Sequence, residues 1–348
     1  MARTRLTLQA IDLHCGGEPL RLITAGFPPV PNLPILERRA WVREHADHVR
    51  RVAMYEPRGH RDMYGAILLP PHGSDADLAI LFMHNEGFST MCGHGTLAVV
   101  TALVEEGLFP ATEPETVIRL EAPAGLVTAR ASVRRTDGGG FEVTGASFAN
   151  VPAYLAARDL EIRPDGLALA GEAAARGALT VDIGFGGAYY GIVEAADLGL
   201  AVEPGNVEAL TRAGAAITEA LRRDHTPTHP FHAEMSFVYG TIIVERLGDG
   251  GWRNVTVFAD AEVDRSPCGS GTSALLAQAA ARGRMGTGDR VANRSISGAI
   301  FEGHVDGETV LGPHPAIDTT IGGTAYVTGY QTLVVDERDP LGLGFLLR

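Results

Sequence analysis

Two cysteines stand in matching contexts, about half the chain length apart. Cys92-Gly-His-Gly-Thr-Leu-Ala and Cys268-Gly-Ser-Gly-Thr-Ser-Ala both follow the pattern C-G-x-G-T-x-A. Each precedes an alanine- and leucine-rich stretch that predicts a helix, Thr96–Glu106 and Thr272–Arg282. A thiol at a helix N-terminus lies beside unpaired backbone N–H groups and the positive end of the helix dipole. We therefore expect a lowered thiol pKa and an accessible thiolate at both positions.

A pair of such thiols predicts acid/base chemistry on a carbon. If one thiol removes a proton from one face of a stereocentre and the other returns a proton to the opposite face, the centre inverts. The glycines of both motifs would let a carboxylate approach the backbone N–H groups, which would also stabilise a developing enediolate. A single cysteine near a helix start is usually a small buried hydrophobe, but core packing does not require this glycine spacing twice.

The elements that must position these motifs are visible as short apolar runs between turn clusters. Six runs predict strands: Leu78–Met83, Thr116–Leu120, Leu126–Ala131, Ile242–Val244, Val255–Phe258 and Thr332–Val335. Gly107 and Gly283 follow the two helices as C-caps would. A stretch rich in proline and glycine between Asn150 and Leu179 predicts a linker. The sequence therefore predicts two parts of similar design.

Composition excludes several classes of function. The 348 residues include no lysine, so all 29 basic residues are arginine, and Schiff-base and P-loop chemistry are excluded. The net charge of −13 argues against nucleic-acid or anionic-membrane partners. Three cysteines are too few for a disulfide framework or a four-thiolate metal site, and no apolar run is long enough to span a membrane. We expect a soluble cytoplasmic protein that holds no metal.

Four segments together form a recognisable set: IDLHCGGEPLR (11–21), EPRGHRDMYGA (56–66), MCGHGT (91–96) and DRSPCGSGTSA (264–274). They resemble the proline racemase family, which includes hydroxyproline 2-epimerases and trans-3-hydroxyproline dehydratases. The resemblance implies an α+β fold of two pseudo-symmetric lobes, each a curved mixed sheet around a central helix, as in diaminopimelate epimerase. It also implies an active site in the cleft between the lobes, no cofactor, and a homodimer.

The resemblance assigns roles to individual residues. Cys92 and Cys268 would be the two bases, and His94 and Asp264 would contact the nitrogen of the substrate ring. The remaining substrate-binding residues would hold the carboxylate or line the ring pocket: Gly93, Gly269, Ser270 and Thr272 for the first, Tyr64 and Phe258 for the second. The substrate would be the small molecule proline or a hydroxyproline.

We expect the N-terminal lobe to span residues 1–178, with residues 331–348 returning to it. The C-terminal lobe would then span residues 179–330. Cys92 would belong to the first lobe and Cys268 to the second.

Two other activities stay open. Several segments, including LFMHNEGFSTMCGH (81–94) and DPLGLGFLL (339–347), look most like trans-3-hydroxy-L-proline dehydratases, which carry threonine at the second cysteine position. Because residue 268 is cysteine here, we favour racemisation or epimerisation, with dehydration as the alternative. A remote alternative is a dinucleotide-dependent oxidoreductase, because Gly93–Ala98 and Gly269–Ala274 fit G-x-G-x-x-A.

Three other features are interpreted as structural. His225, His229 and His232 lie among prolines and predict a solvated loop. Cys15 is the odd thiol and has no role in the proposed chemistry. The arginines between Arg38 and Arg51 fall at helical spacing and predict a solvated helix face.

Overall fold

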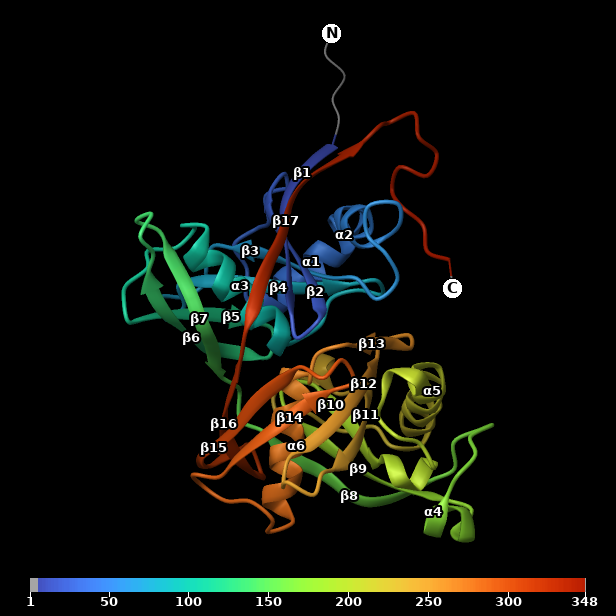
Figure 1. The fold of residues 1–348 in the computed structure, drawn as a ribbon. Helices are drawn as coiled ribbons and strands as arrows, with labels where there is room; N and C mark the ends of the chain where they lie inside the picture. Colours follow the sequence, from blue (N-terminus) through green and yellow to red (C-terminus); the bar gives the residue numbers. More distant parts are fainter. Residues whose placement is uncertain (1–5, 348) are drawn as a thin grey trace. The chain divides into compact units, whose positions relative to one another are not determined.

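The computed structural model describes residues 6–347, which divide into two compact units (Figure 1). Unit 1 contains residues 6–148 and 324–347, and unit 2 contains residues 149–323. The boundary between the two units after residue 148 therefore lies well before the expected boundary at residue 178. The reason is that β8 (Tyr154–Ile162) pairs with β9 (Leu179–Phe185) and so belongs to unit 2.

Unit 1 is built on strands from both ends of the chain. Its elements are β1 (Leu6–Cys15), β2 (Glu18–Ala25), α1 (Ile35–His45), α2 (Asp47–Met54), β3 (Tyr64–Leu69), β4 (Leu78–His84), α3 (Gly93–Glu105), β5 (Glu115–Ala122), β6 (Gly125–Arg135), β7 (Phe141–Ala149) and β17 (Ala325–Val335). β17 runs antiparallel to β1, so the red end of the chain lies beside the blue end in Figure 1. The C-terminal strand β17 thus belongs to unit 1.

Unit 2 contains the second cysteine motif. Its elements are β8, α4 (Gly171–Arg176), β9, β10 (Tyr189–Glu194), α5 (Val207–Asp224), β11 (Val238–Arg246), β12 (Trp252–Phe258), β13 (Glu262–Asp264), α6 (Gly269–Ala281), β14 (Arg290–Ser295), β15 (Ile300–Leu311) and β16 (His314–Gly323), with short 3₁₀ turns at Ala195–Leu198, Pro204–Asn206 and Ala233–Met235. The amphipathic helix α5 packs on β11 and β12.

The two units repeat one order of strand pairing. In unit 1, β1–β2, β3–β4 and β5–β6 are antiparallel, whereas β2–β3 and β4–β5 are parallel. In unit 2, β9–β10, β11–β12 and β14–β15 are antiparallel, whereas β10–β11 and β12–β14 are parallel. The helix α3 stands between β4 and β5 in the chain, and α6 stands between β12 and β14. The prediction of an α+β fold with two pseudo-symmetric lobes is confirmed.

Each unit encloses one helix. In α3 every residue from Gly93 to Val104 is buried, and in α6 every residue from Gly269 to Ala279 is buried. A helix that is apolar on all sides must be surrounded by other elements, and here these are the strands of its own unit. Gly107 and Gly283 follow the helices in the left-handed region, at φ 64° and 67°, as predicted for C-caps. Both helices begin three residues before the predicted start, directly after the cysteine.

All six predicted strands lie within observed strands, but the predicted linker is wrong. The segment 150–179 contains β8 and α4. β8 was not recognised because its pairing with β9 shifts register twice, between Leu155 and Ala157 and between Ala157 and Leu160. These irregularities remove the strict alternation that identifies a strand in the sequence.

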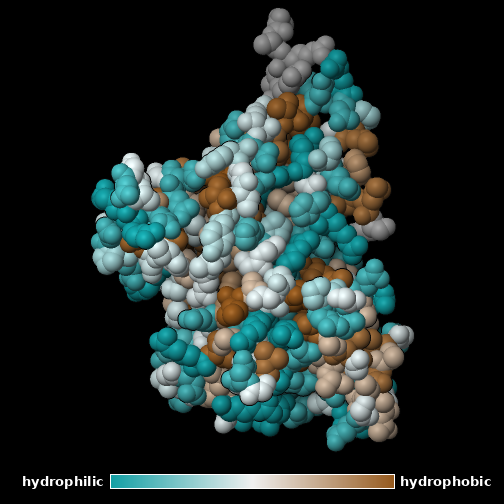
Figure 2. Space-filling model, in the orientation of Figure 1, coloured by the Kyte–Doolittle hydropathy of each residue, from teal (hydrophilic) through white to brown (hydrophobic). Residues whose placement is uncertain are grey.

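The surface in view is largely hydrophilic, with apolar residues in separate patches (Figure 2). Among residues 6–347, no helix combines the length and apolar character needed to cross a lipid bilayer.

Candidate active site

Cys92 is the N-cap residue of α3. Its backbone is extended, at φ −147° and ψ 114°, and its sulfur accepts the N–H of Gly95 at 3.2 Å. A Cβ at Gly95 would lie 2.9 Å from that sulfur, so any residue other than glycine at this position would displace the thiol. The hydroxyl of Thr96 donates to the Cys92 carbonyl at 2.7 Å, and this second hydrogen bond also fixes the first turn of α3.

Two of the predicted substrate-binding residues surround this thiol. Nδ1 of His94 lies 3.3 Å from the Cys92 sulfur. The His94 ring meets the Tyr64 ring edge-on, with 4.8 Å between centroids. The Tyr64 hydroxyl is hydrogen bonded to the Ser89 hydroxyl, in the loop that leads to Cys92. The structure therefore brings Tyr64, His94 and Cys92 together within unit 1, and all three are buried.

Arginines of α1 and α2 hold the loop that precedes Cys92. Arg50 donates to the carbonyls of His84, at 2.9 Å, and of Asn85, while pairing with Asp47. Arg39 donates to the Phe88 carbonyl at 2.9 Å. The prediction of a solvated arginine face is thus wrong for Arg50 and Arg38, which are buried. A guanidinium has five donors and can satisfy several loop carbonyls at once.

Cys268 is the N-cap residue of α6 but has a different backbone from Cys92. Its φ is +61°, a region that a residue with a Cβ adopts at a cost of about 1–3 kcal/mol unless its surroundings impose it. The Pro267 carbonyl accepts the side-chain amides of Asn254, at 3.1 Å, and Asn293, at 3.2 Å. The Thr272 hydroxyl donates to the Cys268 carbonyl at 2.8 Å and accepts from Asn293 at 2.8 Å. These buried side chains hold the strained peptide.

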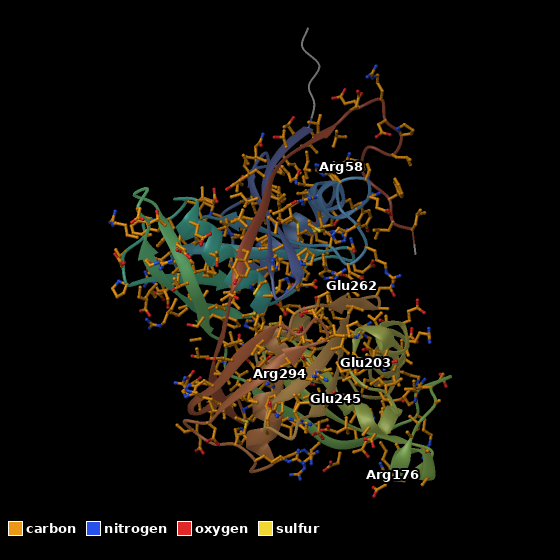
Figure 3. The ribbon with its side chains drawn as sticks, in the orientation of Figure 1. Arg58, Arg176, Glu203, Glu245, Glu262 and Arg294 are labelled. Carbon is orange, nitrogen blue, oxygen red and sulfur yellow. The ribbon has the colours of Figure 1, made fainter. Side chains whose placement is uncertain are left out.

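The chain before Cys268 is folded back by a second set of hydrogen bonds. The Cys268 N–H donates to the Ser266 hydroxyl at 3.1 Å, and the Ser266 N–H donates to the Asp264 carboxylate at 2.8 Å. Asp264 is buried at the end of β13, the short strand on which Figure 3 labels Glu262. This turn, rather than a helix cap, accounts for the spacing of four residues between Asp264 and Cys268.

The sulfur of Cys268 lies 3.8 Å from the Ser270 hydroxyl and 4.0 Å from the Tyr190 hydroxyl. Burial, and then the nearby negative charge of Asp264, raises the pKa of the Cys268 thiol to about 12. The expected lowering of this pKa by the helix N-terminus is therefore wrong. The N–H of Gly271 does lower it, but loss of hydration outweighs that contribution.

The other predicted substrate-binding residues occupy three kinds of place. Gly93 and Gly269 are the first residues of α3 and α6, where backbone N–H groups have no partner within the helix. Phe258 ends β12 and stacks on Tyr239, with 5.5 Å between centroids. The Thr272 N–H donates to the Cys268 carbonyl, as its hydroxyl also does, so the structure favours a positioning role over carboxylate binding.

Sequence reasoning missed Tyr190, Asn254 and Asn293. All three lie on strands and are remote from Cys268 in the chain, so no local spacing links them to it. The one available signal is asparagine within a strand, because strands are depleted in asparagine and a buried amide requires partners.

The histidine loop is only partly solvated. His229 is buried, and its Nδ1 accepts the N–H groups of Phe231 and His232 at 3.3 and 3.1 Å. Burial lowers the pKa of His229, so the prediction of a solvated loop is wrong for this residue. Among residues 6–347, no three His, Cys, Asp or Glu side chains are grouped so that they could hold a metal.

Comparison with known proteins decides the family. Residues 10–346 match the family described as proline racemase. The chain belongs to the proline racemase family. The proline racemase family has the two-lobed α+β fold found here, as the comparison with a solved structure shows. The crystal structure of a hydroxyproline epimerase from Agrobacterium vitis, with bound trans-4-hydroxy-L-proline, is 32% identical, with a TM-score of 0.89 over 98% of this chain and 96% of that one.

Relatives with two different activities are equally similar within the proline racemase family. A trans-3-hydroxy-L-proline dehydratase from Burkholderia cenocepacia (strain HI2424) is 41% identical, over 98% of each chain. A 3-hydroxyproline 2-epimerase from Burkholderia multivorans is also 41% identical, over 98% of each chain. The chain is therefore an enzyme of a family that includes isomerases of amino acids, and overall identity does not separate isomerisation from dehydration.

Proposed function

We propose that this enzyme inverts the α-carbon of proline or a hydroxyproline, with Cys92 and Cys268 as its two acid/base groups. The observation that supports this most is the repetition of one arrangement. Each unit carries a cysteine as the N-cap of its enclosed helix, and the glycine three residues later leaves room for the sulfur. Removal of a proton from one face of Cα and return of a proton to the opposite face is the chemistry that suits such a pair.

The proposed reaction moves one proton at each face. A thiolate takes the proton from Cα, whose electron pair passes into the carboxylate as an enediolate. The thiol on the opposite face then gives its proton to Cα, so the centre is inverted and the net composition is unchanged. In the opposite direction the two sulfurs exchange roles. No external oxidant or reductant is needed.

The two thiols differ in a way that suits this exchange. The raised pKa of Cys268 keeps its proton at neutral pH, as the acid of the pair requires. The Cys92 sulfur accepts the Gly95 N–H and lies beside His94, which suits a thiolate. Asp264 would pair with the cationic nitrogen of the substrate, and this contact would remove part of the negative field that raises the Cys268 pKa.

Apart from Thr272, the remaining predicted contacts keep their roles in the proposal. The unpaired N–H groups at the starts of α3 and α6, from Gly93 and from Gly269 and Ser270, would bind the carboxylate. Tyr64 and Phe258 would form apolar walls for the ring. His94 would contact the ring nitrogen from the side of Cys92.

Dehydration of trans-3-hydroxy-L-proline is the second candidate. It is favoured by the 41% identity to a dehydratase. Dehydration needs one base at Cα, because the 3-hydroxyl leaves and no proton returns. Cys92 alone could perform that step, so the residue at position 268 is the feature that separates the two activities.

The test is a panel of L-proline, trans-4-hydroxy-L-proline and trans-3-hydroxy-L-proline in deuterated water. We expect deuterium at Cα together with a change in optical rotation for at least one of them, and we expect Cys268→Thr to lose inversion. Dehydration of the 3-hydroxy compound by that variant would support the second candidate. Cys15→Ala, at the third cysteine, is the control and should retain inversion. Absence of deuterium incorporation with all three compounds would refute the proposal. Full-rate inversion by Cys268→Thr would remove Cys268 from it.

A further inference from the structure

A pair of hydroxyl groups borders the Cys268 sulfur. The Tyr190 hydroxyl lies 2.8 Å from the Ser270 hydroxyl, and the two oxygens lie 4.0 and 3.8 Å from the sulfur. Tyr190 comes from β10 and is buried, so its hydroxyl is held against the first turn of α6 within unit 2. The three polar atoms form a compact cluster.

Close packing of backbone brings Tyr190 to this position. The hairpin between β9 and β10 turns at Gly186 and Gly187. A Cβ at Gly186 would lie 2.1 Å from the Ser270 carbonyl oxygen, so the hairpin reaches the start of α6 only because residue 186 is glycine. Tyr190, the second residue of β10, therefore lies beside Cys268 because the turn packs against α6 at a glycine.

The proposed reaction creates a need for hydrogen-bond donors here. When Cys268 gives its proton to Cα, a thiolate forms at a site where burial disfavours charge. A hydroxyl can rotate, accepting from a thiol and donating to a thiolate. We propose that Tyr190 is a further catalytic residue, whose hydroxyl, coupled to that of Ser270, donates to the Cys268 sulfur as the thiolate forms. The inference rests on the proposed function.

The proton balance of this step is simple. The S–H bond of Cys268 breaks, a C–H bond forms at Cα, and the negative charge passes from the enediolate to the sulfur. Tyr190 and Ser270 keep their own protons throughout. Burial and the neighbouring Cys268 raise the pKa of Tyr190, so the phenol stays neutral and available as a donor.

The groups that face the sulfur come from several elements. Asp264 of β13 disfavours the thiolate, whereas Ser270 and the Gly271 N–H of α6 and Thr256 of β12 favour it. Tyr239 of β11 meets the Tyr190 ring edge-on at 6.0 Å and also raises the pKa of Tyr190. Ser270 therefore opposes the effect of Asp264 on the thiol, and the Tyr190 hydroxyl is hydrogen bonded to Ser270.

In unit 1 a different residue lies within hydrogen-bonding distance of the cysteine sulfur. Position 94 is histidine, and its ring nitrogen lies 3.3 Å from the Cys92 sulfur. The matching position in the second motif, residue 270, is serine. β2, which has the place of β10 in the pairing order of unit 1, contains no tyrosine. Tyr190 together with Ser270 thus occupies the role that His94 has beside Cys92.

The test compares Tyr190→Phe with Tyr189→Phe. Tyr189 is the adjacent residue of β10, and its hydroxyl pairs with Tyr154 instead of the cysteine. The first readout is the rate of alkylation of each cysteine by iodoacetamide at pH 9, followed by mass spectrometry of the whole enzyme without substrate. Loss of one donor should raise the Cys268 pKa by about one pH unit, which lowers the thiolate fraction tenfold and raises its nucleophilicity about threefold. The net expectation is alkylation of Cys268 about threefold slower, with Cys92 unchanged.

The second readout is kcat for Cα inversion, which should fall at least tenfold in Tyr190→Phe and stay within twofold in Tyr189→Phe. If Tyr190→Phe does not fold, as judged by circular dichroism, Ser270→Ala replaces it and should slow the alkylation of Cys268 in the same direction. A folded variant with wild-type alkylation of Cys268 overturns the inference. Because alkylation needs no substrate, that result is distinct from failure of the proposed reaction, which would appear as absence of Cα exchange in the wild-type enzyme.

Discussion

Gly271→Ala is the sharpest perturbation that the structure offers at Cys268. A Cβ at residue 271 would lie 2.9 Å from the Cys268 sulfur and 3.1 Å from its Cβ. Nonbonded heavy atoms normally rest about 3.5–4.0 Å apart, so the sulfur must move by about 0.6–1.1 Å. A displacement of about 1 Å at a reacting atom can cost about 100-fold in rate. We therefore expect kcat for Cα inversion to fall by about two orders of magnitude.

The fold should survive this change. Residue 271 lies in the first turn of α6, where alanine is favoured over glycine by up to about 1 kcal/mol. A turn of the cysteine side chain away from its preferred rotamer costs about 0.5–1.5 kcal/mol, which is of similar size. Thermal unfolding should thus change little while activity is lost.

The assay is exchange of the Cα proton in deuterated water, with the melting temperature measured on the same samples. Gly286→Ala is the matched control, because residue 286 is also a glycine of unit 2 and an added Cβ there would have no neighbour within 4 Å. Exchange within threefold of wild type in a folded Gly271→Ala enzyme would refute the reasoning, since the sulfur would then tolerate the displacement.

Two further predictions concern a neighbour of Cys268 and the titration of Cys268 itself. Thr272→Val preserves the side-chain shape but removes the hydroxyl that donates to the Cys268 carbonyl and accepts from Asn293. We expect the free energy of unfolding, measured by urea titration, to fall by about 1–3 kcal/mol. In steady-state kinetics, kcat should fall with little change in KM. Because the folded pKa of Cys268 is raised to about 12, its contribution to stability is complete below the unfolded pKa of about 8.5 and is lost as the pH rises toward 12. Relative to Cys268→Ala, the wild-type free energy of unfolding should fall by up to about 1.4 kcal/mol per pH unit above pH 9, and parallel curves for the two proteins would contradict this.

Much of the site could be predicted from local patterns. The glycine spacing after Cys92 and Cys268 was interpreted as room for a carboxylate at the backbone; the structure adds that a Cβ at Gly95 or Gly271 would lie 2.9 Å from a sulfur. The predicted helices and their glycine caps were also correct, because helix start and stop signals act within a few residues.

The state of the second thiol could not be predicted. The helix N-terminus alone argues for a lowered pKa, but Cys268 is buried beside Asp264 and its pKa is raised. Burial depends on what packs against a residue from elsewhere in the chain, and spacing does not report it. The buried arginines illustrate the same limit, since Arg50 has helical spacing yet binds loop carbonyls remote from it in the chain.

The sequence by itself identified the two candidate sulfurs of the proposal, the helices that carry them and the repetition of one design in each half of the chain. Only the tertiary structure decided how each sulfur is held. Asn254, Asn293 and Tyr190 come from three strands of unit 2 and meet around residues 267 and 268. The physical reason is the sequence separation over which each interaction acts. Helix propensity and capping act between near neighbours in the chain. Burial, backbone strain and hydrogen bonds between strands depend on residues that only folding brings together.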